Sequence, residues 1–138
     1  TNQPRLGHGS LDIGELNALH QRIQRVLHAA GARIEAFFFC PHTPTEGCTC
    51  RKPAPGMLEQ IAARYGAEPQ EMWVIGQCKH HIQAGQALGT HVALVHLPDC
   101  HPSCSACTEG AQVPRYASWH ALAQALAATP DAHSPPPA

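Results

Sequence analysis

Three cysteines and one histidine lie within eleven residues and constrain the fold of this chain more than any other feature. They form two pairs, Cys40-Pro41-His42 and Cys48-Thr49-Cys50, in which one residue separates two potential metal ligands. Pro44 and Gly47 let the chain turn tightly between the pairs. Three thiolates and one imidazole close the tetrahedral shell of Zn²⁺ and leave no position open for water. The spacing therefore predicts a structural zinc site, with a chance cluster or a redox pair as alternatives, at Cys40, His42, Cys48 and Cys50.

The composition favours metal ligation in a reducing compartment. The chain has seven Cys and eleven His in 138 residues, and its formal net charge of -1 provides no broad basic surface for nucleic acid. Its apolar stretches are much shorter than the roughly 20 residues of a membrane span, and no charged-then-apolar signal peptide opens it. We therefore expect a cytoplasmic protein that binds neither nucleic acid nor membrane and whose cysteines bind metal in preference to forming disulfides.

Helices and strands are expected to alternate along the chain. Apolar residues at helical spacing predict a helix at about 12–30, with Ser10 or Asp12 as its cap and Gly31 as its end. Two short apolar segments, 33–39 and 72–75, and a third at 91–95 are predicted to be buried strands. Further helices are expected from Pro55 to Gly66 with Leu58, Ile61, Ala62 and Tyr65 inward, at 82–88, and around Trp119, Leu122 and Leu126. This alternation predicts an α/β fold with a parallel sheet covered on both faces.

Two cations follow the predicted metal loop directly. Arg51 and Lys52 precede Pro53-Ala54-Pro55-Gly56-Met57, where the second helix is expected to begin. Lys supplies a point charge, Arg a bidentate fork and the helix start free N–H groups, so the segment could hold a phosphate. A solvated Arg-Lys pair is the alternative interpretation.

Several motifs together resemble one family. They are Thr1-Asn2-Gln3, the zinc pairs with the Arg51–Met57 segment, Val74-Ile75-Gly76 and Ile82-Gln83-Ala84-Gly85. They resemble the D,D-heptose 1,7-bisphosphate phosphatases and their histidinol-phosphatase relatives, which are haloacid-dehalogenase-type hydrolases of carbohydrate and related metabolism. The resemblance implies a Rossmann-like parallel sheet flanked by helices, over residues 1–128, with a zinc-binding loop. The Pro-rich end, 129–138, is expected to be a disordered tail.

The resemblance also implies roles for individual residues. Cys40, His42, Cys48 and Cys50 would hold the zinc, and the phosphate or substrate would be bound by Thr1, Asn2, Arg51 and Lys52. In such enzymes the aspartate nucleophile and the acid-base aspartate lie on a strand that precedes the Thr-Asn-Gln motif. No residue of this sequence matches them, so the domain is expected to be incomplete, truncated at its N-terminus and without a catalytic residue.

A second departure from the family concerns Mg²⁺. After Gly76 the family expects an Asp and commonly a further Asp four residues on, whereas this chain has Gln77 and His81. A neutral amide and an imidazole are poor ligands for a cation that prefers charged oxygen. Mg²⁺, expected for the family, is therefore not expected to be held here. A new transition-metal site at Cys78, His80 and His81 is the alternative to simple decay of the motif.

A second cysteine cluster leaves its interpretation open. Cys100, Cys104 and Cys107, with His96 and His101 nearby, could hold another metal or remain free, oxidisable thiols.

The motifs favour a degenerate phosphatase-like domain over two alternative functions. It is expected to be inactive as it stands and to bind, if binding is retained, a sugar or small-molecule phosphate. The alternatives are an active phosphatase completed by an upstream segment and a non-catalytic zinc-stabilised binding module. Without the family's central strand, the chain is expected to pair Ile34–Phe39 with Met72–Ile75, to borrow a strand from a second copy or a partner, or to stay partly open.

Overall fold

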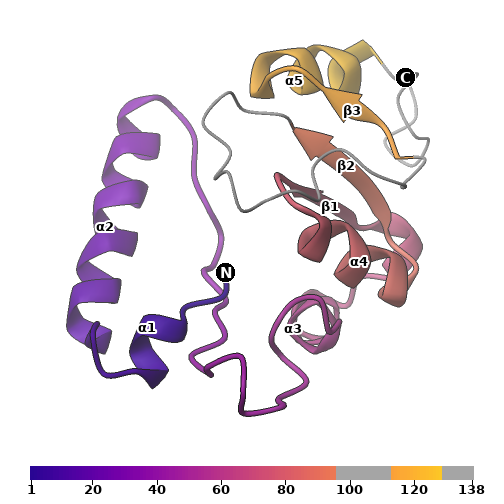
Figure 1. Ribbon diagram of the computed structural model, residues 1–138. Coiled ribbons are helices and arrows are strands. Elements are labelled where there is room, and N and C mark those ends of the chain that lie inside the picture. The colour runs from indigo at the N-terminus through magenta and orange to yellow at the C-terminus, as the bar shows by residue number, and fades with distance from the viewer. Residues whose placement is uncertain (96–112, 129–138) are drawn as a thin grey trace. The chain divides into compact units, whose positions relative to one another are not determined.

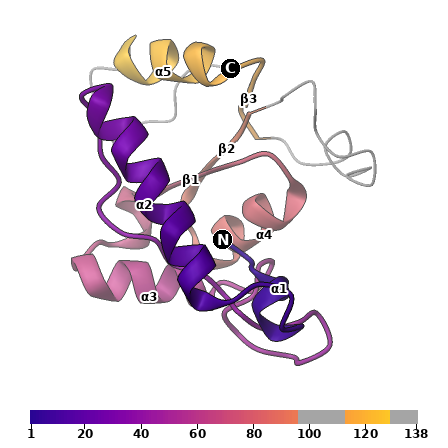
Figure 2. The ribbon, with the colours of Figure 1, turned by 90° about the vertical axis from the view of Figure 1, so that its left-hand side faces the viewer.

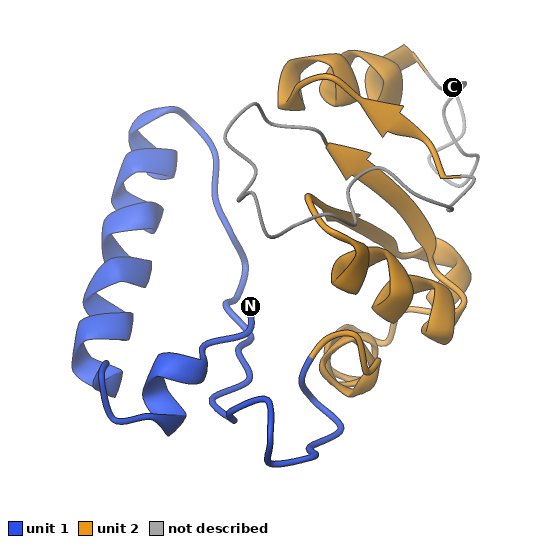
Figure 3. Ribbon diagram, viewed as in Figure 1, with its two compact units in different colours: residues 1–51 blue, residues 52–138 orange. Residues whose placement is uncertain are grey.

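The computed structural model describes residues 1–95 and 113–128 (Figure 1). The chain divides into two compact units, Thr1–Arg51 and Lys52–Ala138 (Figure 3), which are taken separately below. The predicted tail at 129–138 and the cluster at Cys100, Cys104 and Cys107 lie outside the described residues. In the part of the chain that is described, no helix has the length and apolar character needed to cross a membrane.

The first unit begins with a short helix, α1 (Pro4–Gly7), followed by the long helix α2 (Ile13–Ala29). Asp12 caps α2: its Oδ1 accepts the backbone N–H of Glu15 at 2.8 Å, and Glu15 Oε2 accepts that of Asp12 at 2.9 Å. Gly31, with φ of +75°, follows the helix where a left-handed residue favours glycine. The predicted helix is confirmed, with Asp12 as its cap. Leu16 is its only buried residue.

Replacing Asp12 with alanine should lower the free energy of unfolding by about 1 kcal/mol, since two helix N–H groups lose their acceptors or their fixed geometry. Ser10, the other candidate cap, offers a matched control. The Ser10→Ala change should cost less than about 0.5 kcal/mol, because it removes no cap of α2. Denaturant titration of both variants measures the difference. Equal losses for the two changes would contradict the assignment of the cap.

The predicted strand at 33–39 is not formed. These residues have no strand assignment, and only Cys40, just beyond them, makes an isolated parallel bridge, with Asn2. The Gln24 side chain accepts the backbone N–H of Ile34 at 3.1 Å and donates to its carbonyl oxygen, so these backbone groups are satisfied without a neighbouring strand. The prediction was wrong because an apolar segment becomes a strand only where a partner backbone lies alongside it. The proposed pairing of Ile34–Phe39 with Met72–Ile75 is likewise absent from the described sheet.

The second unit contains a parallel sheet of three described strands in the order β1-β2-β3. The strands are β1 (Trp73–Gly76), β2 (His91–Val95) and β3 (Arg115–Tyr116). Val74 lies opposite Val92, and Leu94 opposite Arg115. The predicted strands at 72–75 and 91–95 are confirmed to within one residue. The two-residue β3 was not predicted, because it is too short to show a period.

Helices cover both faces of this sheet. They are α3 (Gly56–Tyr65), the 3₁₀ turn Pro69–Glu71, α4 (Lys79–Leu88) and α5 (Trp119–Ala128). Figures 1 and 2 show α3 and α4 on one side of the sheet and α5 on the other. In one apolar cluster, Leu58 of α3 and Ala84 of α4 pack with Val74 of the sheet. In the other, Leu122 of α5 packs with the sheet residues Ala93, Val95 and Tyr116. The predicted α/β architecture is confirmed.

Two details of the helices differ from expectation. Tyr65, predicted to face inward, is 49% exposed at the last turn of α3. Helix α4 begins at Lys79, three residues before the predicted start, because polar residues in its first turn hid the helical pattern. Gly66 and Gly89 end α3 and α4 with φ of 60° and 83°, as their positions in the sequence predicted.

Candidate functional site

The four predicted metal ligands lie together in the first unit. Their ligand atoms are all within 4.8 Å of one another. Cys50 Sγ is 3.2 Å from Cys40 Sγ, 3.7 Å from Cys48 Sγ and 3.3 Å from His42 Nδ1. A tetrahedral ion with metal–sulfur bonds of about 2.3 Å would place its sulfur ligands about 3.8 Å apart. The cluster therefore has the size of a single four-coordinate metal shell.

Local backbone contacts hold these ligands in place. The buried Cys40 donates its N–H to Thr1 O at 2.9 Å and accepts the N–H of Gln3 at its carbonyl at 2.8 Å. Gly7 donates its N–H to Pro41 O at 3.0 Å. Arg51 Nη1 donates to His42 O at 3.3 Å. Contacts with Thr1, Gln3 and Gly7 thereby fix the backbone of the first pair of ligands. Arg51, which follows the second pair, is bonded back to the first pair at His42.

The electrostatics of the cluster favour a bound cation. Burial, reinforced by the neighbouring thiols of Cys40 and Cys48, raises the pKa of Cys50 to about 12. Desolvation acts to raise the pKa of Cys48 as well. Hydrogen bonds to this thiol, of which the one with Cys40 has the largest effect, outweigh the desolvation, so the pKa of Cys48 is lowered. Three thiolates at this separation repel one another, and a divalent cation would remove that repulsion.

The predicted phosphate-binding residues fall into both units. Asn2 forms the bridge with Cys40, Thr1 Oγ1 accepts a hydrogen bond from Gln3 Nε2 at 3.2 Å, and Arg51 contacts the loop through His42. These three residues therefore lie beside the metal ligands. Lys52 opens the second unit, where burial lowers the pKa of its ammonium while the charge of Cys78 opposes that shift.

The loop at the carboxyl end of β1 brings together a thiol and an imidazole. Cys78 Sγ lies 3.0 Å from His81 Nδ1, at the start of α4. Burial and then the charge of Lys52 lower the pKa of His81 to about 4, so its ring is neutral at physiological pH. The sequence named both residues as potential ligands but not as a hydrogen-bonded pair. Their i, i+3 spacing across a helix start is the signal that could have indicated it.

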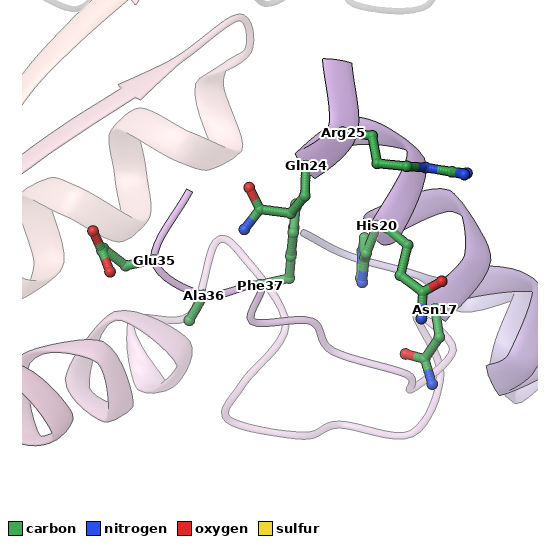
Figure 4. A pocket seen from close by; sticks show the side chains of 8 residues that line it. Asn17, His20, Gln24, Arg25, Glu35, Ala36 and Phe37 are labelled. Carbon is green, nitrogen blue, oxygen red and sulfur yellow. The ribbon is translucent and has the colours of Figure 1, made fainter. Parts of the chain in front are cut away.

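A groove in the first unit lies apart from these residues. It has a volume of about 680 Å³ and runs between α2 and residues 35–37. His20 stacks on Phe37 with ring centroids 4.1 Å apart, and Figure 4 shows these rings together with Gln24. None of the predicted site residues lines it.

Comparison with known proteins places the fold and its loops in a family. A family model described as HAD-hydrolase-like matches residues 49–98. The crystal structure of D,D-heptose 1,7-bisphosphate phosphatase from Bordetella bronchiseptica, complexed with magnesium and phosphate, matches 92% of this chain and 71% of its own chain, with a TM-score of 0.79 and 33% identity. This chain belongs to that phosphatase family. The family resemblance and the haloacid-dehalogenase-like fold inferred from the motifs are therefore confirmed.

Curated members of the family extend beyond the matched region. The D-glycero-beta-D-manno-heptose-1,7-bisphosphate 7-phosphatase of Neisseria meningitidis serogroup A is 39% identical over 95 residues, which are 69% of this chain and 51% of that protein. The histidine biosynthesis bifunctional protein HisB of Legionella pneumophila is 33% identical over 76 residues, 55% of this chain and 22% of that protein. The chain spans about half the length of the heptose bisphosphate phosphatases that it matches.

The magnesium named with the phosphatase structure does not suit the loop after β1. Residues 76–81 contain no carboxylate, and Cys78 and His81 are hydrogen-bonded to each other. Mg²⁺ requires hard oxygen ligands, which this thiol and imidazole do not supply. A three-ligand site at Cys78, His80 and His81 is not formed either: among residues 1–95 and 113–128, ligand atoms gather in threes or more at the Cys40 cluster alone.

Proposed function

We propose that residues 1–138 form a phosphatase-family domain that a structural zinc stabilises and that does not by itself hydrolyse phosphate esters. The observation that carries this proposal is the loop after β1, where Gln77 and a Cys78–His81 hydrogen bond stand in place of carboxylates. Without a divalent cation, the charge on a phosphate would repel a carboxylate nucleophile and remain unneutralised in the transition state. No residue here matches the family's nucleophile.

Zinc is the metal we assign to Cys40, His42, Cys48 and Cys50. Thiolates and an imidazole match its borderline softness, and the ligand distances suit a tetrahedral shell. Four protein ligands leave no place for a water, so the metal would hold the loop without taking part in hydrolysis. The cytosol is the compartment we propose, because its reducing conditions keep such thiols available to metal.

A sugar or small-molecule phosphate is the ligand class we propose, in line with the bisphosphate phosphatases to which the chain is similar. Lys52 would contribute a positive charge to its binding, since the ammonium group lies in the second unit close to the loop after β1. A non-catalytic binding module, the alternative named from the sequence, would bind phosphate without hydrolysing it.

A second candidate is an active phosphatase whose catalytic residues come from a further segment. It is favoured by the matched length, since curated relatives are about twice as long as the region they share with this chain. In that case a catalytic cation would have to be held beside Gln77 and His81, which are poor ligands for Mg²⁺.

A phosphatase assay separates these possibilities. Residues 1–138 with Mg²⁺ and a heptose 1,7-bisphosphate should turn over at least about 10³-fold more slowly than the Bordetella bronchiseptica enzyme assayed alongside, because several kcal/mol of transition-state stabilisation are missing. Turnover that is abolished both by EDTA and by Lys52→Ala would refute the proposal. Titration with inorganic phosphate, followed by phosphorus NMR, tests retained binding separately, and Lys52→Ala should weaken it.

A further inference from the structure

The three sulfur atoms of the metal cluster are not equally far apart. Cys50 Sγ lies 3.2 Å from Cys40 Sγ, whereas Cys48 Sγ lies 3.6 Å from Cys40 Sγ and 3.7 Å from Cys50 Sγ. A disulfide bond is about 2.0 Å long, so the sulfurs of Cys40 and Cys50 need to approach by roughly 1 Å. Cys48 and Cys50 flank a single residue, and a bond between them would close a small, strained ring. Cys40 and Cys50 are therefore the pair best placed to form a disulfide.

Backbone contacts that involve no metal hold these two cysteines near each other. Cys40 donates its backbone N–H to Thr1 O at 2.9 Å. Arg51, which directly follows Cys50, donates from Nη1 to His42 O at 3.3 Å and so ties the end of the loop to its beginning. These contacts act on the backbone, so they keep the two thiols on facing parts of the loop while a sulfur–sulfur bond replaces the bonds to a metal.

The two thiols differ in their access to solvent. Cys50 is partly exposed, whereas Cys40 is fully buried. A small peroxide can therefore reach the sulfur of Cys50, and the buried Cys40 is the neighbouring thiol that can attack this sulfur once it is oxidised. Redox-sensing proteins often use the same arrangement, in which an accessible cysteine lies next to a resolving cysteine.

We propose that Cys40 and Cys50 are a site of reversible oxidation by peroxides, at which a disulfide takes the place of the bound zinc. The thiolate of Cys50 attacks one oxygen of hydrogen peroxide, the O–O bond breaks, and a sulfenic acid and hydroxide form. The thiolate of Cys40 then attacks the oxidised sulfur, the sulfur–sulfur bond forms and a second hydroxide leaves. The two thiolates together give two electrons to the peroxide, and both hydroxides take up protons from solvent.

This oxidation couples the state of two sulfurs to the metal content of the first unit. In the oxidised chain His42 and Cys48 are the donors that remain in the cluster, and two donors are too few to close a tetrahedral shell. Zinc is therefore released, and reduction of the disulfide restores all four ligands. The inference rests on the zinc assignment proposed above. It also fits a reducing compartment, where disulfides are usually transient and redox-sensing.

Treatment of the full chain, loaded with zinc and freed of reductant, with hydrogen peroxide tests the proposal. Released zinc is measured with a chromogenic chelator, and disulfides are mapped by mass spectrometry of peptides prepared without reduction. We expect one zinc to be released for each disulfide formed between Cys40 and Cys50. Addition of dithiothreitol with fresh zinc should return the metal to the chain, because the thiol reagent reduces the disulfide.

A chain without the four other cysteines is the matched control, with the changes Cys78→Ser, Cys100→Ser, Cys104→Ser and Cys107→Ser. It should release zinc from the cluster at the native rate, because none of these thiols takes part in the reaction. Zinc release with Cys40 joined to Cys48, or with no disulfide at Cys40, would overturn the proposal. So would a native chain that keeps its zinc while Cys78 is oxidised.

The same experiment separates a failure of this inference from a failure of the zinc assignment. A native chain that holds no zinc before peroxide is added would refute the zinc assignment. The disulfide map then decides the oxidation site by itself, because a peroxide should still join Cys40 to Cys50. Should the control chain not fold, as judged by circular dichroism, the map of the native chain decides alone.

Discussion

A Cys48→Ser chain should lose its zinc and, with it, the order of residues 1–51. Cys48 supplies one of the four potential ligand atoms that lie within 4.8 Å of one another. The first unit has little else to stabilise it, since Leu16 and Cys40 are its only buried apolar residues and Cys40 is itself one of the proposed ligands. Burying one leucine contributes about 1.5–3 kcal/mol, whereas structural zinc contributes an apparent ~10–16 kcal/mol in small metal domains. A zinc bound by these four residues would therefore contribute more than the apolar core of this unit.

Elemental analysis of protein purified without added metal measures this effect, together with circular dichroism of α2. The native chain should contain one zinc held by the Cys40 cluster, and the Cys48→Ser chain should contain none there. Cys78→Ser is the matched control, because it removes a free thiol from the second unit and should leave the zinc content unchanged. Equal zinc in the native and Cys48→Ser chains would rule out the ligand assignment.

Much of the fold could be predicted because its signals are local. Asp12 and Glu15 reveal the start of α2 through their reciprocal capping, and the glycines with positive φ at Gly31, Gly66 and Gly89 mark where helices end. Such contacts join residues within a few positions of one another, so a short segment of sequence contains both partners. The helix ends were accordingly predicted closely, while the start of α4, which has no side-chain cap, was misplaced.

The segment 33–39 could not be predicted in the same way. Its three consecutive phenylalanines are typical of a buried strand, yet Phe37, Phe38 and Phe39 are only half-buried. Part of the segment is held by a side chain of α2, Gln24, and part by the N-terminal residues. Whether an apolar segment pairs depends on backbone groups far away in the sequence, which a local pattern does not contain.

The same difference between local signals and distant contacts applies to the candidate site. The clustering of Cys40, His42, Cys48 and Cys50 could be predicted because both pairs lie on one loop, where spacing nearly determines geometry. The contact of His81 with Cys78 depends on where α4 begins and on the space above Gly76. Neither of these can be predicted from residue types alone.

Truncating Leu122 to alanine should lower the free energy of unfolding by about 2–5 kcal/mol, against a typical total of about 5–15. Leu122 is 2% exposed and packs in one cluster with Ala93, Val95 and Tyr116 of the sheet. Its loss would leave a cavity between α5 and two strands that cannot easily close, because the strands are fixed by their parallel pairing. Denaturant titration, monitored by circular dichroism, gives the change.

Leu126 provides the control, because it lies one turn further along the same helix and is 36% exposed. Leu126→Ala removes the same atoms with the same change in helix propensity, so only burial distinguishes the two variants. It should cost no more than about 1 kcal/mol, since its side chain already meets solvent and leaves no closed cavity. Equal losses would mean that α5 does not cover this face of the sheet through Leu122. A larger loss at Leu122, with Leu122→Met costing less than about 1.5 kcal/mol, would show that the helix is held by volume at that position.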